Sequence, residues 1–81
     1  MFSGEDKVAP SESRFWQSLR RHNATTRTNG LSGRQRRYYQ YDRRHGGEVE
    51  VYDRNGRHLG AADPHTGEMI KGPVKGRRIR P

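Results

Sequence analysis

Residues that can transfer protons gather in one short stretch of the chain, which holds Asp42, His45, Glu48 and Glu50. Two or three carboxylates with one imidazole are a set suited to general acid and base catalysis. Charged side chains on the outer face of a strand are more often simply exposed to water than catalytic. Even a shifted pKa indicates an active site only with some probability. These four residues are therefore candidate catalytic groups, and a solvated strand face is the alternative.

Two strands and a turn are predicted to position these residues. Residues 48–52 alternate polar and apolar side chains, which predicts a strand with Val49 and Val51 on one face and the glutamates on the other. Residues 38–41 are rich in tyrosine and predict the preceding strand. Residues 43–47 form the connection, whose two glycines supply positive φ angles. Such a hairpin brings the four candidate residues together on one polar face.

Further turn signals predict more strands after this hairpin. Asn55-Gly56 favours a type I′ turn, which leads into a short returning strand at residues 58–62. Residues 63–68 contain a proline and a glycine placed for another turn, and residues 69–70 open a last strand. Because hairpin follows hairpin, the predicted fold class is α+β: a short N-terminal helix packed on a small, highly twisted antiparallel β-sheet.

The chain divides into a lead-in and one domain. Residues 1–10 show no periodicity and predict a flexible lead-in. Residues 11–81 are expected to form a single domain, with a helix at about 11–22, a basic loop at 24–37 and the sheet and catalytic core at 38–79. In the helix, Phe15, Trp16 and Leu19 recur at helical spacing and are interpreted as core packing.

Composition limits what the protein can be. The 81 residues suffice for one domain, and 27% hydrophobic residues predict a small core. Cysteine is absent, which excludes disulfides and thiolate metal sites. No apolar run reaches the length of a membrane span, and no signal-peptide core follows Met1. The net charge of +8 predicts a polyanionic partner, and nucleic acid is favoured over an acidic protein or a membrane surface.

The basic loop meets the aromatic strand directly. Three arginines at residues 34–37 precede Tyr38, Tyr39 and Tyr41. Arginine beside tyrosine suits a surface that stacks bases and neutralises phosphates. Tyrosines in a strand equally often pack in the core. Both interpretations stay open on the sequence.

A metal site is the first competing hypothesis. His22, His45, His58 and His65 could join carboxylates in ligating a cation. However, no two histidines have the spacing of a metal motif, and they fall on separate hairpins. The sequence therefore predicts no metal and no cofactor.

Several motifs occur in one order with characteristic spacing. They are Tyr-x-Tyr-Asp-x-x-His-Gly, Glu-x-Glu-x-Tyr, Asn-Gly-x-His-Leu-Gly, Asp-Pro-x-Thr-Gly, Lys-Gly-Pro and a late Arg before Ile. Together they span residues 39–79, about half of the chain. In that combination the chain resembles the cytotoxic domain of the ribosome-inactivating E-type colicins.

The resemblance implies a function. Such domains are metal-independent ribonucleases that cut the small-subunit ribosomal RNA at the decoding centre and so block translation. They are carried into the cytoplasm of a target bacterial cell as part of a larger toxin, and an acidic immunity protein inhibits them in the producer. Their fold is a short helix on a strongly twisted antiparallel sheet, as expected above.

The resemblance also assigns residues. Asp42, His45, Glu50 and the late Arg77 match the family's catalytic groups. The predicted substrate-binding residues are Tyr52 and His58, which accompany that site, together with Glu48, Lys71 and Arg78.

Three departures from the family pattern bear on this assignment. The chain has Gly46-Gly47 where the family has one glycine, and this leaves Glu48 a rival to Glu50. Glu-x-Tyr spacing favours Glu50. The turn at Asn55-Gly56 is one residue shorter, which a turn tolerates, and Tyr41 replaces a tryptophan beside the aspartate.

The side chains suggest a mechanism for RNA cleavage. We expect Glu50 to remove the proton of the 2′-hydroxyl and His45 to protonate the leaving 5′-oxygen. Asp42 would orient the imidazole, and Arg77 would bind the scissile phosphate. The reverse assignment, with His45 as the base, stays open.

Two hypotheses from other classes remain. The chain could be a non-catalytic basic module that binds RNA or the ribosome, or a small domain that binds an acidic protein. Carboxylates beside a bound phosphate weaken affinity and therefore favour the catalytic hypothesis.

Overall fold

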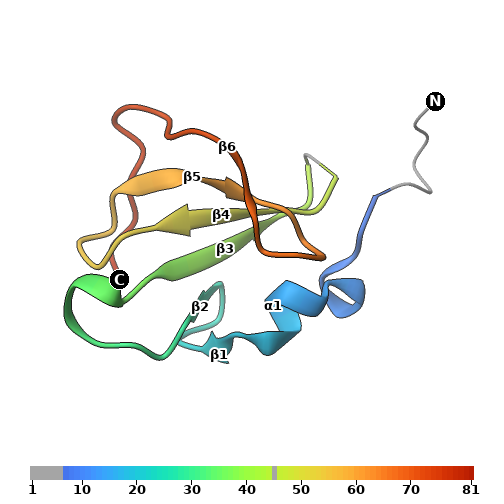
Figure 1. Ribbon diagram of the computed structural model, residues 1–81, viewed down its shortest axis with the longest axis horizontal. Coiled ribbons are helices and arrows are strands. Elements are labelled where there is room, and N and C mark those ends of the chain that lie inside the picture. Colours follow the sequence, from blue (N-terminus) through green and yellow to red (C-terminus); the bar gives the residue numbers. More distant parts are fainter. Residues whose placement is uncertain (1–6, 45) are drawn as a thin grey trace.

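An antiparallel β-sheet is the central element of the fold. The computed structural model describes residues 7–44 and 46–81, and within them six strands follow one another in the sheet in chain order (Figure 1). The strands are β1 (Arg20–Arg21), β2 (Thr26–Thr28), β3 (Tyr38–Asp42), β4 (Glu48–Tyr52), β5 (His58–Ala62) and β6 (Met69–Lys71). The predicted α+β fold class and the hairpins from residue 38 onward are confirmed.

The N-terminal helix is much shorter than predicted. Short 3₁₀ turns occur at η2 (Pro10–Glu12) and η3 (Gly33–Gln35), and the α-helix α1 covers only Arg14–Ser18. Ser13 caps α1, because its hydroxyl accepts the Trp16 N–H at 3.0 Å. The expected helix over residues 11–22 was wrong at its end, where Leu19 is extended and the chain enters β1. A helix of this length has little stability of its own, so strand pairing decides the conformation.

The expected basic loop over residues 24–37 was also partly wrong. Thr26 and Thr28 belong to β2, which pairs with β3 through Thr26↔Gln40 and Thr28↔Tyr38. Threonine is β-branched and suits a strand, and β3 would otherwise expose an unpaired edge.

The lead-in contacts the sheet where it can be described. The N–H of Val8 donates to the Gly46 carbonyl at 3.1 Å, and the Tyr41 hydroxyl donates to the Val8 carbonyl at 2.7 Å. These contacts join Val8 to the β3–β4 hairpin, residues 1–6 lie outside the described residues, and the expected flexibility of residues 1–10 stays a prediction.

The core lies between one sheet face and α1. Its buried residues are Trp16, Tyr39, Val49, Val51 and Ala62, with Phe15, Leu19, Tyr41 and Leu59 packed against them. Phe15 meets Tyr39 edge-on at 5.4 Å, and Trp16 meets Tyr41 edge-on at 5.5 Å. Each such buried side chain contributes roughly 1.5–3 kcal/mol. The packing prediction for the helix is confirmed, and Tyr38 and Tyr39, each 7% exposed, are not a base-stacking surface.

A hydrogen bond from Ser13 connects the start of α1 to the turn between β5 and β6. The Ser13 hydroxyl donates to the Pro64 carbonyl, which lies in the turn between β5 and β6. The same carbonyl accepts the Phe15 N–H at 3.1 Å. Figure 1 shows α1 beside this turn.

The segment after β6 returns along the sheet. The Ile79 N–H donates to the Gly56 carbonyl at 2.8 Å, and the His58 N–H donates to the Arg77 carbonyl at 3.1 Å. Gly56 has φ +85°, and a Cβ there would lie 2.0 Å from the Ile79 carbonyl oxygen. The turn occurs where it was predicted, but the predicted type I′ was wrong, because no described residue other than glycine has a positive φ and the Gly56 N–H donates to the Asp53 carbonyl at 2.9 Å. Glycine at position 56 also lets the returning segment approach. No helix in the described ranges is long and apolar enough to cross a membrane.

Candidate active site

Polar side chains from four strands and the returning segment meet in one pocket of about 180 Å³. Strand register explains the meeting, since Asp42 pairs with Glu48, Glu50 with Ala61, and Ala61 with Lys71. Paired residues share a face, and this face is opposite the core. The pocket is lined by Asp42, Glu48, Glu50, His58, Ala61, Lys71, Gly72, Val74 and Arg77.

Glu50 is the centre of this pocket. The residue is 8% exposed, and its Oε1 accepts hydrogen bonds from two different donors. His58 Nε2 lies at 2.7 Å and Arg77 Nη1 at 3.0 Å from that oxygen. A buried carboxylate needs such partners, because burying an unpaired charge is costly. The strand face that the sequence left open to solvent is thus covered at Glu50.

His58 has its tautomer set by its neighbours. The Val74 backbone N–H donates to Nδ1 at 2.8 Å, so Nδ1 carries no proton. The ring proton therefore sits on Nε2 and is donated to Glu50. A neutral histidine in this arrangement has both nitrogens engaged. Tyr52 packs edge-on against the ring at 5.2 Å.

Tyr52 stays protonated beside Glu50. Burial raises the pKa of its hydroxyl above the ordinary value of 10.0, and the negative charge of Glu50 raises it further. The hydroxyl therefore remains a potential hydrogen-bond donor at neutral pH.

Glu48 has a different partner from Glu50. Lys71 Nζ lies 3.0 Å from Glu48 Oε1 and 2.8 Å from Oε2. The hydrogen bond to Glu48 raises the pKa of the Lys71 ammonium, which is consequently charged at neutral pH. The Lys71 side chain is 58% exposed, whereas that of Glu48 is 15% exposed. The pair forms the outer edge of the pocket.

The three carboxylates are close enough to be considered for metal binding. Oxygen atoms of Asp42, Glu48 and Glu50 all lie within 4.8 Å of one another. Oxygen donors of this kind suit a hard divalent cation. Lys71 already pairs with Glu48, and Arg77 and His58 each bond to Glu50. We therefore assign no metal here.

The three described histidines do not gather. His22 packs against Tyr38 with ring centroids 5.0 Å apart, His58 lies in the pocket, and His65 lies in the turn after β5.

The pocket gathers most of the residues that were chosen from the sequence. Of the predicted catalytic residues, Asp42, Glu50 and Arg77 line one pocket. His45 falls outside the described residues. The predicted substrate-binding residues Glu48, His58 and Lys71 line the same pocket, and Tyr52 packs on the ring of His58.

Arg78 lies elsewhere. Its backbone bridges to Arg57, and its exposed side chain is not part of the pocket lining. Val74 was missed by sequence reasoning, because its contribution is a backbone N–H that leaves no signal in the residue type.

Comparison with known proteins identifies the class to which this fold and site belong. Residues 17–80 match the protein family described as Cytotoxic. That match covers most of the chain, so the protein belongs to the Cytotoxic family.

Two individual relatives are similar to the chain. Cloacin from Escherichia coli is 46% identical over 48 residues, which are 58% of this chain and 8% of cloacin. Colicin E3 from Escherichia coli is 46% identical over 46 residues, which are 56% of this chain and 8% of colicin E3. The chain thus corresponds to a small part of these relatives, and no solved structure matches it. The resemblance to the E-type colicin cytotoxic domain is confirmed.

Proposed function

We propose that the protein is a toxin ribonuclease that cleaves small-subunit ribosomal RNA at the decoding centre and blocks translation. The observation that carries the proposal is a buried glutamate, Glu50, held by His58 and Arg77 in a pocket with two more carboxylates. Carboxylates disfavour phosphate binding, so their presence in a chain of net charge +8 supports a chemical role. Family membership and the similarity to colicin E3 support the same activity.

Glu50 is the general base in this proposal. Both of its hydrogen bonds fall on Oε1, and we assign Oε2 to accept the proton of the RNA 2′-hydroxyl. The 2′-oxygen then forms a bond to phosphorus as the bond to the 5′-oxygen breaks. The products are a 2′,3′-cyclic phosphate and a 5′-hydroxyl, with no oxidant, metal or cofactor in the balance. General base catalysis of this kind contributes about 100- to 10,000-fold.

Arg77 supplies positive charge to the scissile phosphate in this proposal. One of its N–H groups is donated to Glu50, and the side chain is 44% exposed at the mouth of the pocket. A guanidinium has five N–H donors in a planar fork that matches phosphate oxygens. We assign it to bind the scissile phosphate and stabilise the charge of the phosphorane. Lys71 would assist from the outer edge.

The general acid is assigned to His45, with Asp42 as the carboxylate that orients it. His58 is unsuited to this role, because Nδ1 accepts a backbone N–H and Nε2 donates its proton to Glu50. His58 is instead a positioning residue for Glu50. The assignment of His45 rests on the sequence motif, in which it follows Asp42 at the family spacing.

The partners proposed for the protein are the ribosome and an acidic immunity protein. The chain corresponds to 8% of the length of cloacin and of colicin E3, which supports its being one part of a larger toxin. Delivery would bring it to the cytoplasm of a target bacterial cell. A basic surface suits both the RNA and the inhibitor.

The deciding experiment incubates the purified protein with intact bacterial ribosomes in EDTA. We expect one discrete fragment from the 3′ end of the small-subunit RNA, with His45→Ala and Glu50→Gln proteins as inactive controls. Intact RNA together with tight ribosome binding would overturn the proposal in favour of a non-catalytic RNA-binding module. Cleavage that survives Glu50→Gln at the wild-type rate would transfer the role of base to Glu48 or His45.

A further inference from the structure

A second hollow of about 680 Å³ lies on the other side of β3 from the active-site pocket. Tyr41 lines this groove, whereas Asp42, the next residue, lines the pocket. Successive residues of a strand point to opposite faces, so one strand serves both hollows. The N-terminal turn, α1 and the β1–β2 hairpin form the other walls. We call this hollow the arginine groove.

The lining of the groove is positively charged. It includes Arg21, Arg27 and Arg43 and, within the described part of the chain, no aspartate or glutamate. The nearby Glu12 carboxylate accepts the Ala9 N–H at 3.1 Å. The three arginines outnumber that one carboxylate, and the groove remains cationic.

Two contacts orient the guanidinium of Arg27. Its guanidinium lies over the Trp16 ring at 4.7 Å from the centroid, and Nη1 donates to the Trp16 carbonyl at 2.8 Å. Stacking and one hydrogen bond fix the plane of a group that has five N–H donors. A guanidinium immobilised in this way loses less entropy when it binds a phosphate.

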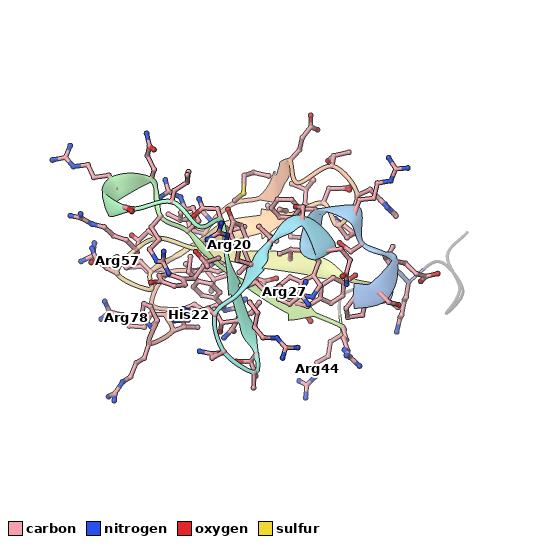
Figure 2. All side chains as sticks on the ribbon, turned by 90° about the horizontal axis from the view of Figure 1, so that it is seen from below. Arg20, His22, Arg27, Arg44, Arg57 and Arg78 are labelled. Carbon is pink, nitrogen blue, oxygen red and sulfur yellow. The ribbon has the colours of Figure 1, made fainter. Side chains whose placement is uncertain are left out.

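Further basic residues continue along the same side of the molecule. In Figure 2, Arg27 and Arg44 lie near the middle of the view, with Arg44 at the lower edge, and Arg57 and Arg78 lie at the left. Arg43 and Arg44 belong to the turn that follows Asp42 and joins β3 to β4. Asp42 lines the pocket and Arg43 lines the groove, so the two hollows adjoin this turn from opposite faces of the sheet.

We propose that the arginine groove binds a backbone phosphate of the RNA substrate beside the segment that enters the active site. The proposal rests on the proposed ribonuclease function, whose substrate is the polyanion. Recognition is by phosphate and not by base, because Trp16 is 8% exposed and its ring is covered by Arg27. Binding in the groove is consequently independent of RNA sequence.

The test measures RNA affinity at several salt concentrations. A single-stranded RNA oligonucleotide is titrated with the Glu50→Gln protein, in which cleavage is disabled, and with the same protein carrying Arg21→Gln and Arg43→Gln. Both arginines are exposed, so the substitutions leave the core unchanged. The slope of log K against log salt should become shallower by about 0.7 for each phosphate contact that is lost.

A matched control separates the groove from net charge. Arg54→Gln with Arg80→Gln removes the same charge from exposed positions outside the groove. The control should retain most of the slope, while the groove variant should bind at least several-fold more weakly at low salt. Equal losses in the two variants would overturn the proposal.

Two further outcomes distinguish the proposals from each other. A groove variant that keeps its RNA slope but loses affinity for an acidic inhibitor protein would show that the groove is a protein interface, and would overturn the RNA proposal. A wild-type protein that does not cleave ribosomal RNA, yet shows groove-dependent RNA binding, would refute the ribonuclease function and leave the groove supported.

A conservative variant tests the geometry of the guanidinium. Arg27→Lys keeps the charge but not the planar fork, so its RNA affinity at low salt should fall between those of the wild type and the double variant.

Discussion

The active-site pocket and the arginine groove lie on opposite faces of one sheet and use arginine in different ways. In the pocket, Arg77 and Lys71 are paired with Glu50 and Glu48. In the groove, Arg27 is held by an aromatic ring and a backbone carbonyl, neither of which carries a negative charge. A cation that is paired with a carboxylate adds little net attraction for phosphate, whereas a cation held by neutral groups keeps its full attraction. This difference supports the proposals of chemistry in the pocket and of phosphate affinity in the groove.

The sharpest test of this division replaces Glu50 by glutamine. We expect the cleavage rate to fall about 100- to 10,000-fold, because the proton acceptor is lost while the shape is kept. RNA binding should not weaken. Glu48→Gln is the matched control, since it removes the same charge from the neighbouring carboxylate. Single-turnover cleavage of ribosomes measures both, and equal losses would mean that the two glutamates act as one unit.

A second test separates neighbouring arginines. Arg77→Ala should lower the cleavage rate about 100- to 1,000-fold, because it removes a donor that stabilises transition-state charge. Arg78→Ala removes the same charge from an exposed side chain outside the pocket and should have a small effect on the rate. If Arg78→Ala proves as damaging, the contribution is general charge and not the geometry at Glu50.

A third test looks for effects of opposite sign on affinity. Glu48→Gln frees Lys71 from its partner and removes a repulsive charge, so RNA binding should tighten about two- to fivefold at low salt. Groove substitutions should weaken binding. Titration of the RNA oligonucleotide with each variant measures the difference, and weaker binding by Glu48→Gln would contradict the division of roles.

The smallest expected effect is on the pH dependence of stability, through the buried tyrosines. Burial raises the pKa of Tyr39 above 10.0, and Tyr41 and Tyr52 shift in the same direction for the same leading cause. Above about pH 10 the unfolded chain therefore holds fewer protons than the folded chain. The contribution of these tyrosines to the free energy of unfolding is complete below that pH and is lost as the pH rises. Tyr39→Phe should make the fall shallower. Urea unfolding at several alkaline pH values measures this, and an unchanged slope would show that Tyr39 does not titrate with unfolding.

The pocket could be largely predicted from the sequence, whereas the groove could not. The alternation at residues 48–52 is a strong strand signal, and the short turns fix its neighbours, so Asp42, Glu48 and Glu50 were placed on one face. The role given to Arg77 came from the family resemblance alone. Its contact with Glu50 depends on a segment without regular structure, which no periodicity describes.

The groove depends on the segments that were predicted wrongly. Arg21 was assigned to a helix and Arg27 to a loop, but both belong to short strands. Strands of this length carry no periodic signal, and their pairing is set by the exposed edge of β3. The contact of Arg27 with Trp16 joins two elements whose relative position only the fold determines. The prediction for His45 stays a prediction.

The return of the chain after β6 has a consequence for the cell that makes this protein. Arg77 follows all six described strands in the sequence, so it is translated after every other residue assigned to the pocket. A nascent chain can form the earlier hairpins while Arg77, which is proposed to bind the scissile phosphate, is still inside the ribosome. Under the proposed function, the site on the nascent chain is therefore incomplete until Arg77 has left the ribosome.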